Sequence, residues 1–142
     1  LAVTTYDGAD IYEEDRNRDR VTVEASQGTL SLSKTVRNVT RGTPEGVSNG
    51  AGAGDVLEYR IYLENTGTLP ASDIQIFDRT PPYTVLDGPV PSPVVISSGV
   101  TCSIVSPTTN SADYSGDLRW ECSGLYPAGA QGAVSFQVRV SP

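Results

Sequence analysis

Apolar residues recur at every second position in several short stretches of this chain. The alternation is clearest within residues 54–83, where one set of positions is apolar or aromatic: Leu57, Tyr59, Ile61 and Leu63. Successive side chains of a β-strand point to opposite faces, so this pattern predicts a strand with one buried face. The turn-prone Asn65-Thr66-Gly67 follows, and Ile74 and Ile76 then resume the alternation up to Pro81-Pro82.

Shorter alternating or apolar segments occupy much of the rest of the chain. They predict strands near the following residues: Val21 and Val23; Leu30, Leu32 and Val36; Val85 and Leu86; Val94 to Ile96; Val100 to Ile104; Leu118 to Cys122; and Val134 to Val140. No segment of ten or more residues has the three- and four-residue spacing of an amphipathic helix. About eight short strands separated by Gly and Pro turns predict an all-β antiparallel sandwich.

The charge and hydropathy of the chain narrow the classes of function. A net charge of −7 with a pI near 4.4, and only scattered basic residues, argue against a nucleic-acid partner. No apolar run approaches the ~18 residues of a membrane-spanning helix, so we expect no membrane span. The sequence contains no Met and begins at Leu1. We therefore interpret it as an exported, mature protein from which a signal peptide has been removed.

The two cysteines, Cys102 and Cys122, both lie in strand-like surroundings. In an exported sandwich they predict a structural disulfide between neighbouring strands. Two reduced thiols in a cytosolic protein are the alternative.

The chain has no histidine, which excludes Ser-His-Asp and Cys-His nucleophilic sites and the usual zinc sites. Asp78 is the nearest candidate for an acid or base, and we interpret it as a residue that caps a strand end or accepts backbone donors before Pro81. We predict no enzyme, no catalytic residue, no cofactor and no metal site. Weak cation binding stays open at a dense acidic group, which comprises Asp7, Asp10, Glu13, Glu14 and Asp15.

Several motifs carry a resemblance to one family. A strand entered through Gly54-Asp55 and ending at Glu64-Asn65-Thr66-Gly67, followed by Phe77-Asp78 and a Pro, resembles the conserved repeat domain of bacterial and archaeal surface proteins. The similarity extends upstream to residues 30–34 and downstream to Trp120, Gly124-Leu125 and residues 129–140, and so spans roughly residues 28–142. This resemblance implies an extracellular immunoglobulin-like sandwich, of the kind found in stalks and fibres, without catalytic residues.

This resemblance divides the chain into an N-terminal arm, residues 1–27, and a sandwich domain, residues 28–142. Residues 1–12 have strand-forming residues, and residues 13–20 are all charged or Asn and predict a linker. A complete sandwich within residues 28–142 leaves the arm without a neighbour in its own sheets.

Our leading hypothesis is a structural subunit of an extracellular, pilus-like filament. The arm of one copy would insert as a donor strand in the sandwich of the next, in a head-to-tail homopolymer. The expected donor-strand anchors are Leu1, Val3, Tyr6 and Ile11. The alternative for the arm is an extra edge strand on its own domain.

A second hypothesis is a monomeric adhesin or stalk module that binds glycan or protein. Its binding loops would be residues 41–54 and 87–99, with an aromatic contribution from Tyr62, Tyr83 or Tyr114. Two places could carry covalent glycans: Asn38, in the acceptor triplet Asn38-Val39-Thr40, and the Ser/Thr-rich loop 106–115.

Overall fold

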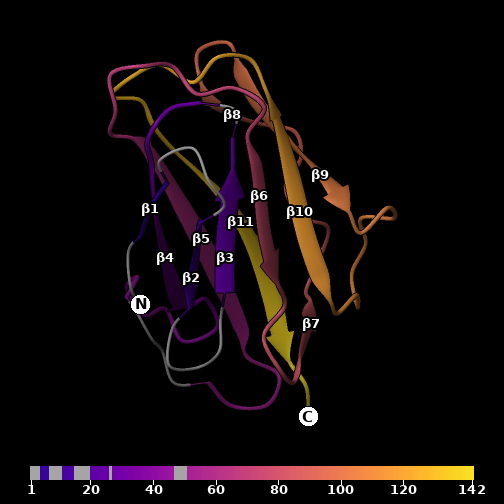
Figure 1. Ribbon diagram of the computed structural model, residues 1–142. Helices are drawn as coiled ribbons and strands as arrows, with labels where there is room; N and C mark the ends of the chain where they lie inside the picture. The colour runs from indigo at the N-terminus through magenta and orange to yellow at the C-terminus, as the bar shows by residue number, and fades with distance from the viewer. Residues whose placement is uncertain (1–3, 7–10, 15–19, 26, 47–50) are drawn as a thin grey trace.

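The structure, a computed structural model, describes residues 4–6, 11–14, 20–25, 27–46 and 51–142, with side chains from Val21 onward. Within these residues the chain forms strands and no helix. The strands assemble in two antiparallel sheets that face each other across one core (Figure 1). The predicted all-β antiparallel sandwich is therefore confirmed.

The first sheet has the strand order β1-β4-β5-β11-β7. Its long strands are β4 (Leu30–Asn38), β5 (Val56–Asn65) and β11 (Gln131–Val140), and short strands lie at its edges: β1 (Thr4–Tyr6) and β7 (Thr84–Leu86). Every second residue of β4 and β5 is buried, as the alternating sequence predicts.

The second sheet has the order β2-β3-β6-β10-β9-β8. In this order its strands are β2 (Ile11–Glu14), β3 (Arg20–Glu24), β6 (Gln75–Arg79), β10 (Asp117–Ser123), β9 (Val100–Ser106) and β8 (Val94–Ser97). The strand β8, which follows the Pro-rich segment, lies at the free edge, where a strand does not need every backbone donor.

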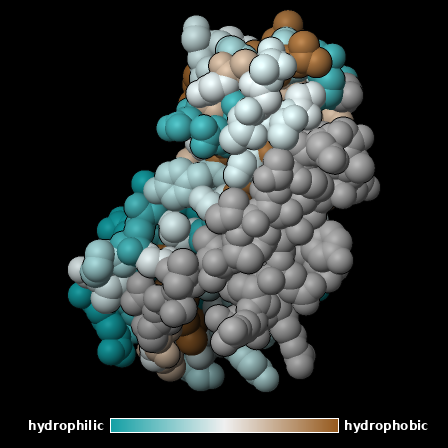
Figure 2. Space-filling model, turned by 60° about the vertical axis from the view of Figure 1, so that its left-hand side comes forward, coloured by the Kyte–Doolittle hydropathy of each residue, from teal (hydrophilic) through white to brown (hydrophobic). Residues whose placement is uncertain are grey.

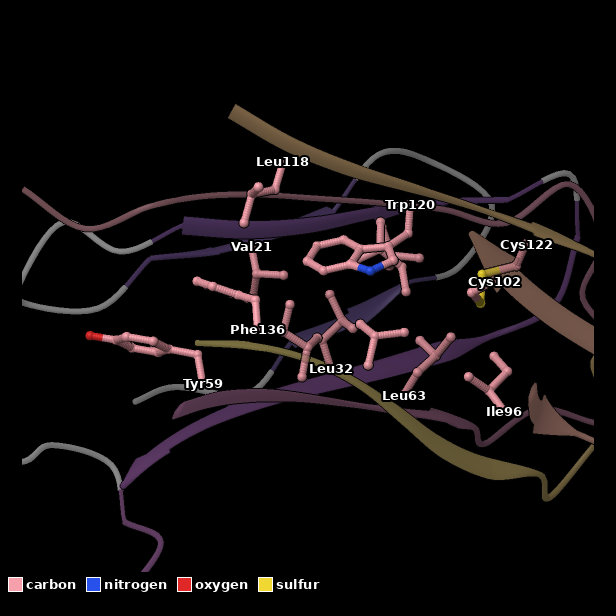
Figure 3. Packing of buried hydrophobic residues seen from close by; sticks show 14 of the residues in the cluster. Val21, Leu32, Tyr59, Leu63, Ile96, Cys102, Leu118, Trp120, Cys122 and Phe136 are labelled. Carbon is pink, nitrogen blue, oxygen red and sulfur yellow. A yellow bond between two sulfur atoms is a disulfide. The ribbon is translucent and has the colours of Figure 1, made fainter. Parts of the chain in front are cut away.

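Aromatic residues of both sheets meet in the core. Trp120 of β10 is fully buried and its ring lies 6.1 Å from that of Phe136 of β11, while Tyr59 of β5 stacks on Phe136 at 5.3 Å. Figure 3 shows these rings between the two sheets, close to Val21 and Leu118. The prediction that Trp120 fills the core is confirmed.

The two cysteines form the predicted disulfide. Cys102 of β9 and Cys122 of β10 are directly opposite in the ladder, with Cα atoms 3.9 Å apart. The bond thus joins two neighbouring strands of the second sheet, and the alternative of two free thiols is wrong.

The predicted boundary at residue 28 is wrong, because β3 belongs to the sandwich. It pairs with β6, with Val23 opposite Ile76, and Val21 and Val23 are fully buried in the core. The alternation at Val21 and Val23, which follows the charged residues 13–20, predicted a strand but not the sheet to which that strand belongs. The second sheet therefore needs residues that we had assigned to the arm.

The Asn65-Thr66-Gly67 motif organises one end of the sandwich. The buried Asn65 side chain donates from Nδ2 to the carbonyl oxygens of Leu69 (2.8 Å) and Tyr126 (3.0 Å), and its Oδ1 accepts from the Gly67 N–H (3.0 Å). The Tyr126 hydroxyl donates to the Leu63 carbonyl, and burial raises the pKa of this hydroxyl to about 12. The motif is thus a structural tie between the ends of β5 and β10.

Candidate functional site

The N-terminal segment lies at the outer edge of both sheets. The three residues of β1 pair with the start of β4, with Thr5 opposite Ser31, and the four residues of β2 pair with β3. Figure 1 shows both short strands on the same side of the sandwich as β3 and β4. Both outer edges on this side are therefore covered by the first residues of the chain itself.

This pairing corrects our expectation that the arm has no neighbour in its own chain. Tyr6 lies opposite Leu30 and Ile11 opposite Val23, as the alternative of an extra edge strand predicts. Of the other two expected anchors, Leu1 and Val3 lie outside the described residues. The expected linker 13–20 contributes Glu13 and Glu14 to β2 and Arg20 to β3, and its residues 15–19 lie outside the described part of the chain.

The segment after β4 covers the far end of the same β4 edge. Val36 donates its N–H to the Gly46 carbonyl (2.8 Å) and accepts from the Gly46 N–H (2.9 Å), so the segment after β4 folds back onto it. Glu45 fixes this segment, because its carboxylate accepts from the hydroxyls of Tyr62 and Thr35, both at 2.7 Å. These bonds, with that from Tyr62 the stronger, lower the pKa of Glu45. This segment thus pairs with β4 at Val36, and β1 pairs with Leu30 to Leu32 of the same strand.

Asp55 holds the beginning of the long loop between β4 and β5. One of its carboxylate oxygens accepts from the Gly52 N–H (3.0 Å), the Asn38 side-chain amide (2.9 Å) and the Arg41 guanidinium (2.8 Å). These three donors, the Gly52 N–H first, lower the pKa of Asp55 to about 2.

Asn38, the candidate glycan acceptor, is completely buried. Its Nδ2 donates to Asp55, and its Oδ1 accepts from the Arg41 N–H at 3.0 Å. The amide nitrogen that would carry a glycan is therefore enclosed in the folded domain. This burial argues against a glycan at Asn38, and the sequence triplet alone does not report it.

The three candidate tyrosines of the binding hypothesis differ in accessibility. Tyr62 is engaged by Glu45, and Tyr114 donates to the Asp117 carbonyl (2.8 Å), whereas Tyr83 is 85 % exposed. Tyr83 accepts from the Ser141 N–H and lies at the end of the sandwich where β11 terminates. In the expected binding loop 87–99, by contrast, Val90 and Ile96 are buried. These two residues anchor the loop to the core, and most of its other residues, such as Val95, are exposed or half-buried.

Hydrophobic side chains are exposed at the opposite end of the sandwich. Leu69 is 58 % and Leu125 61 % exposed, and their loops are joined by a backbone bridge between Ala71 and Tyr126. Figure 2 shows hydrophobic atoms, in brown, at the upper end of the molecule, where Figure 1 places the loops after β5 and β10.

An ion pair between the sheets escaped the sequence analysis. Lys34 of β4 and Asp78 of β6 face each other in the interior, with Nζ 3.1 Å from Oδ1 and 3.0 Å from Oδ2. Their side chains are 3 % and 0 % exposed. Alternate positions along β4 (30, 32, 34, 36), and along Ile74 and β6 (74, 76, 78), place both side chains on inward faces, and this alternation was the signal for the pair. Asp78 Oδ1 also accepts from the Arg79 N–H (2.7 Å), so our interpretation that Asp78 binds backbone donors before Pro81 accounts for one of its contacts but missed Lys34.

The residues that the structure describes contain no group of three or more His, Cys, Asp or Glu side chains placed to hold a metal ion. They also contain no helix long and apolar enough to cross a membrane.

Comparison of the chain with protein-family models, with curated proteins and with solved structures found no match.

Proposed function

We propose that the chain is a structural subunit of an extracellular filament, in which the N-terminal segment of one copy pairs with the sheet edges of the next. The observation that carries this proposal is the position of β1 and β2, each the outermost strand of its sheet. Among the residues whose side chains the structure describes, the buried hydrophobic ones run from Val21 to Val138 and come from both sheets. The segment pairs with the edges of these sheets.

Short edge strands favour exchange between copies. With three and four residues, β1 and β2 are held by few ladder hydrogen bonds, each worth about 1 kcal/mol net. Once they leave, the edges of β4 and β3 present unpaired backbone groups that accept an extended strand. The same residue pairs can then form between two copies, as in domain swapping. Because donor and acceptor surfaces differ, the contact is head-to-tail and propagates.

The disulfide is consistent with the proposed compartment. Disulfides persist in oxidising surroundings outside the cytosol, and Cys102–Cys122 lies buried within a sheet. The disulfide therefore supports a location outside the cytoplasm, where a filament subunit of this kind would assemble.

A cysteine pair between the arm and its acceptor strand tests the exchange. We expect T5C/S31C, oxidised before assembly, to close each arm on its own domain and to give monomers in light scattering. Oxidation after assembly should give a ladder of covalent multimers on a non-reducing gel, because Thr5 then faces Ser31 of a neighbour.

The matched control, S31C/E64C, uses the same acceptor position but joins β4 to β5 within one sandwich. It should leave assembly unchanged and give no ladder. The exchange is ruled out if the pre-oxidised T5C/S31C protein assembles as the control does, or if assembled material contains only intramolecular T5C/S31C disulfides.

The second candidate is a binding module that uses the end of the sandwich near Tyr83. The nearly complete exposure of this aromatic ring favours it, because stacking of sugars or apolar groups needs an open ring face. A glycan array probed with the wild type and with Tyr83→Ala tests it. Equal signals for the two proteins, or no signal for either, would remove this candidate.

A further inference from the structure

The inter-sheet pair involves the only lysine of the chain. Of the ten basic residues, Lys34 is the single amine, and all the others are arginines. The cationic side chains on the outside of the described sheets are therefore arginines, for example Arg79 and Arg119. The one side chain that can act as an amine nucleophile lies instead inside the sandwich against a carboxyl group.

The geometry brings the amine within reach of the carboxyl carbon. Lys34 Nζ lies 3.0–3.1 Å from both oxygens of Asp78, so it faces the carbon between them. A productive approach needs reacting atoms about 3–3.5 Å apart, held there without loss of further freedom. Because β4 and β6 belong to different, facing sheets, the packing of the core holds this approach.

The pair lies in an aromatic interior, out of contact with water. Nζ lies 4.8 Å from the ring centroid of Tyr59 and 5.9 Å from that of Phe136, the stacked rings shown between the sheets in Figure 3, and these rings attract the ammonium less strongly than water does. Removing an ammonium and a carboxylate from water costs free energy that their attraction repays only in part. Any reaction that replaces the two ions by one neutral group is therefore favoured at this position.

We propose that Lys34 and Asp78 condense to an isopeptide bond that joins the two sheets. A proton passes from the ammonium to the carboxylate, the neutral amine attacks Cγ, and a Nζ–Cγ bond forms. One Cγ–O bond then breaks, and the oxygen leaves as water with two of the three ammonium protons. The third proton stays on the amide nitrogen, so the step is balanced without an oxidant or a co-reactant. It is independent of the proposed filament.

Cleavage after lysine tests the bond directly. An endoproteinase that cuts only after lysine should divide the denatured, reduced chain once, into residues 1–34 and 35–142. We expect the mature protein to resist this cut, because an acylated lysine is not a substrate, and to be one water lighter than its sequence mass. An arginine-specific digest should yield residues 21–37 joined to residues 61–79.

Two variants complete the experiment. Asp78→Ala should be cut completely at Lys34, and because the digest is made on denatured protein, the result does not depend on how well this variant folds. Asp55→Asn, which changes another mostly buried aspartate, should resist as the wild type does. Complete cleavage of the wild type at Lys34 overturns the proposal. So does a mass one water too low without the joined peptides, because a succinimide at Asp7-Gly8 or Asp87-Gly88 also loses one water.

Discussion

Two carboxylates of the domain, Asp55 and Asp78, are withdrawn from water by different partners. Asp55 is surrounded by hydrogen-bond donors that favour its ionised form, and two of them, the Gly52 N–H and the Asn38 amide, are neutral. Asp78 faces Lys34 within an aromatic core, and its Oδ1 also accepts from the Arg79 N–H. The first arrangement keeps a carboxylate ionised, and the second favours loss of both charges.

Asp55 should make the domain sensitive to acid. Its pKa is about 2 in the folded chain, below its ordinary value of 3.8, so its contribution to stability is complete above pH 4. That contribution falls as the pH drops from about 4 to about 2. We expect Asp55→Asn to be less stable than the wild type at pH 7, and the difference between their unfolding midpoints to shrink in this window. A difference that is constant from pH 7 to pH 2 would contradict this.

At the scale of elements, the disulfide should stabilise the β9–β10 ladder. Cys102 and Cys122 close a loop of 20 residues. The loop-closure estimate for such a length is about 3 kcal/mol. We expect C102A/C122A to lose about this much free energy of unfolding in urea titrations and to keep its strand content by circular dichroism. An unchanged urea midpoint would show that the bond contributes nothing to stability.

Alternation predicted the strands better than it predicted their neighbours. It gave the buried faces of β4 and β5, and with them the sandwich, because side-chain direction in a strand follows from local geometry. It also placed Lys34 and Asp78 on inward faces, but the packing of one sheet on the other decides that they meet. The sequence analysis also missed that β3 belongs to the second sheet, because this depends on its pairing with β6, which lies more than 50 residues away in the sequence.

At the scale of the whole molecule, the two proposals meet at one side of the sandwich. The proposed acceptor strands are β4 and β3, which belong to different sheets. Lys34 lies in β4, and Asp78 lies in β6, the strand that pairs with β3. An amide between them would join the acceptor strand β4 covalently to β6, the neighbour of the acceptor strand β3, behind the surface that receives the next copy. A pull along a filament would then be carried by both sheets together.

Deletion of residues 1–14 separates folding from assembly. The variant keeps every described buried hydrophobic residue, since these begin at Val21. We expect it to retain strand content by circular dichroism and the near-ultraviolet signal of the buried Trp120, and to form no filaments in electron micrographs. A synthetic peptide of residues 1–14 should bind to it, because the edges of β3 and β4 are open, and should give capped monomers rather than polymer. Filaments of unchanged geometry in the deleted protein would show that another surface, such as the exposed Leu69 and Leu125, makes the contact.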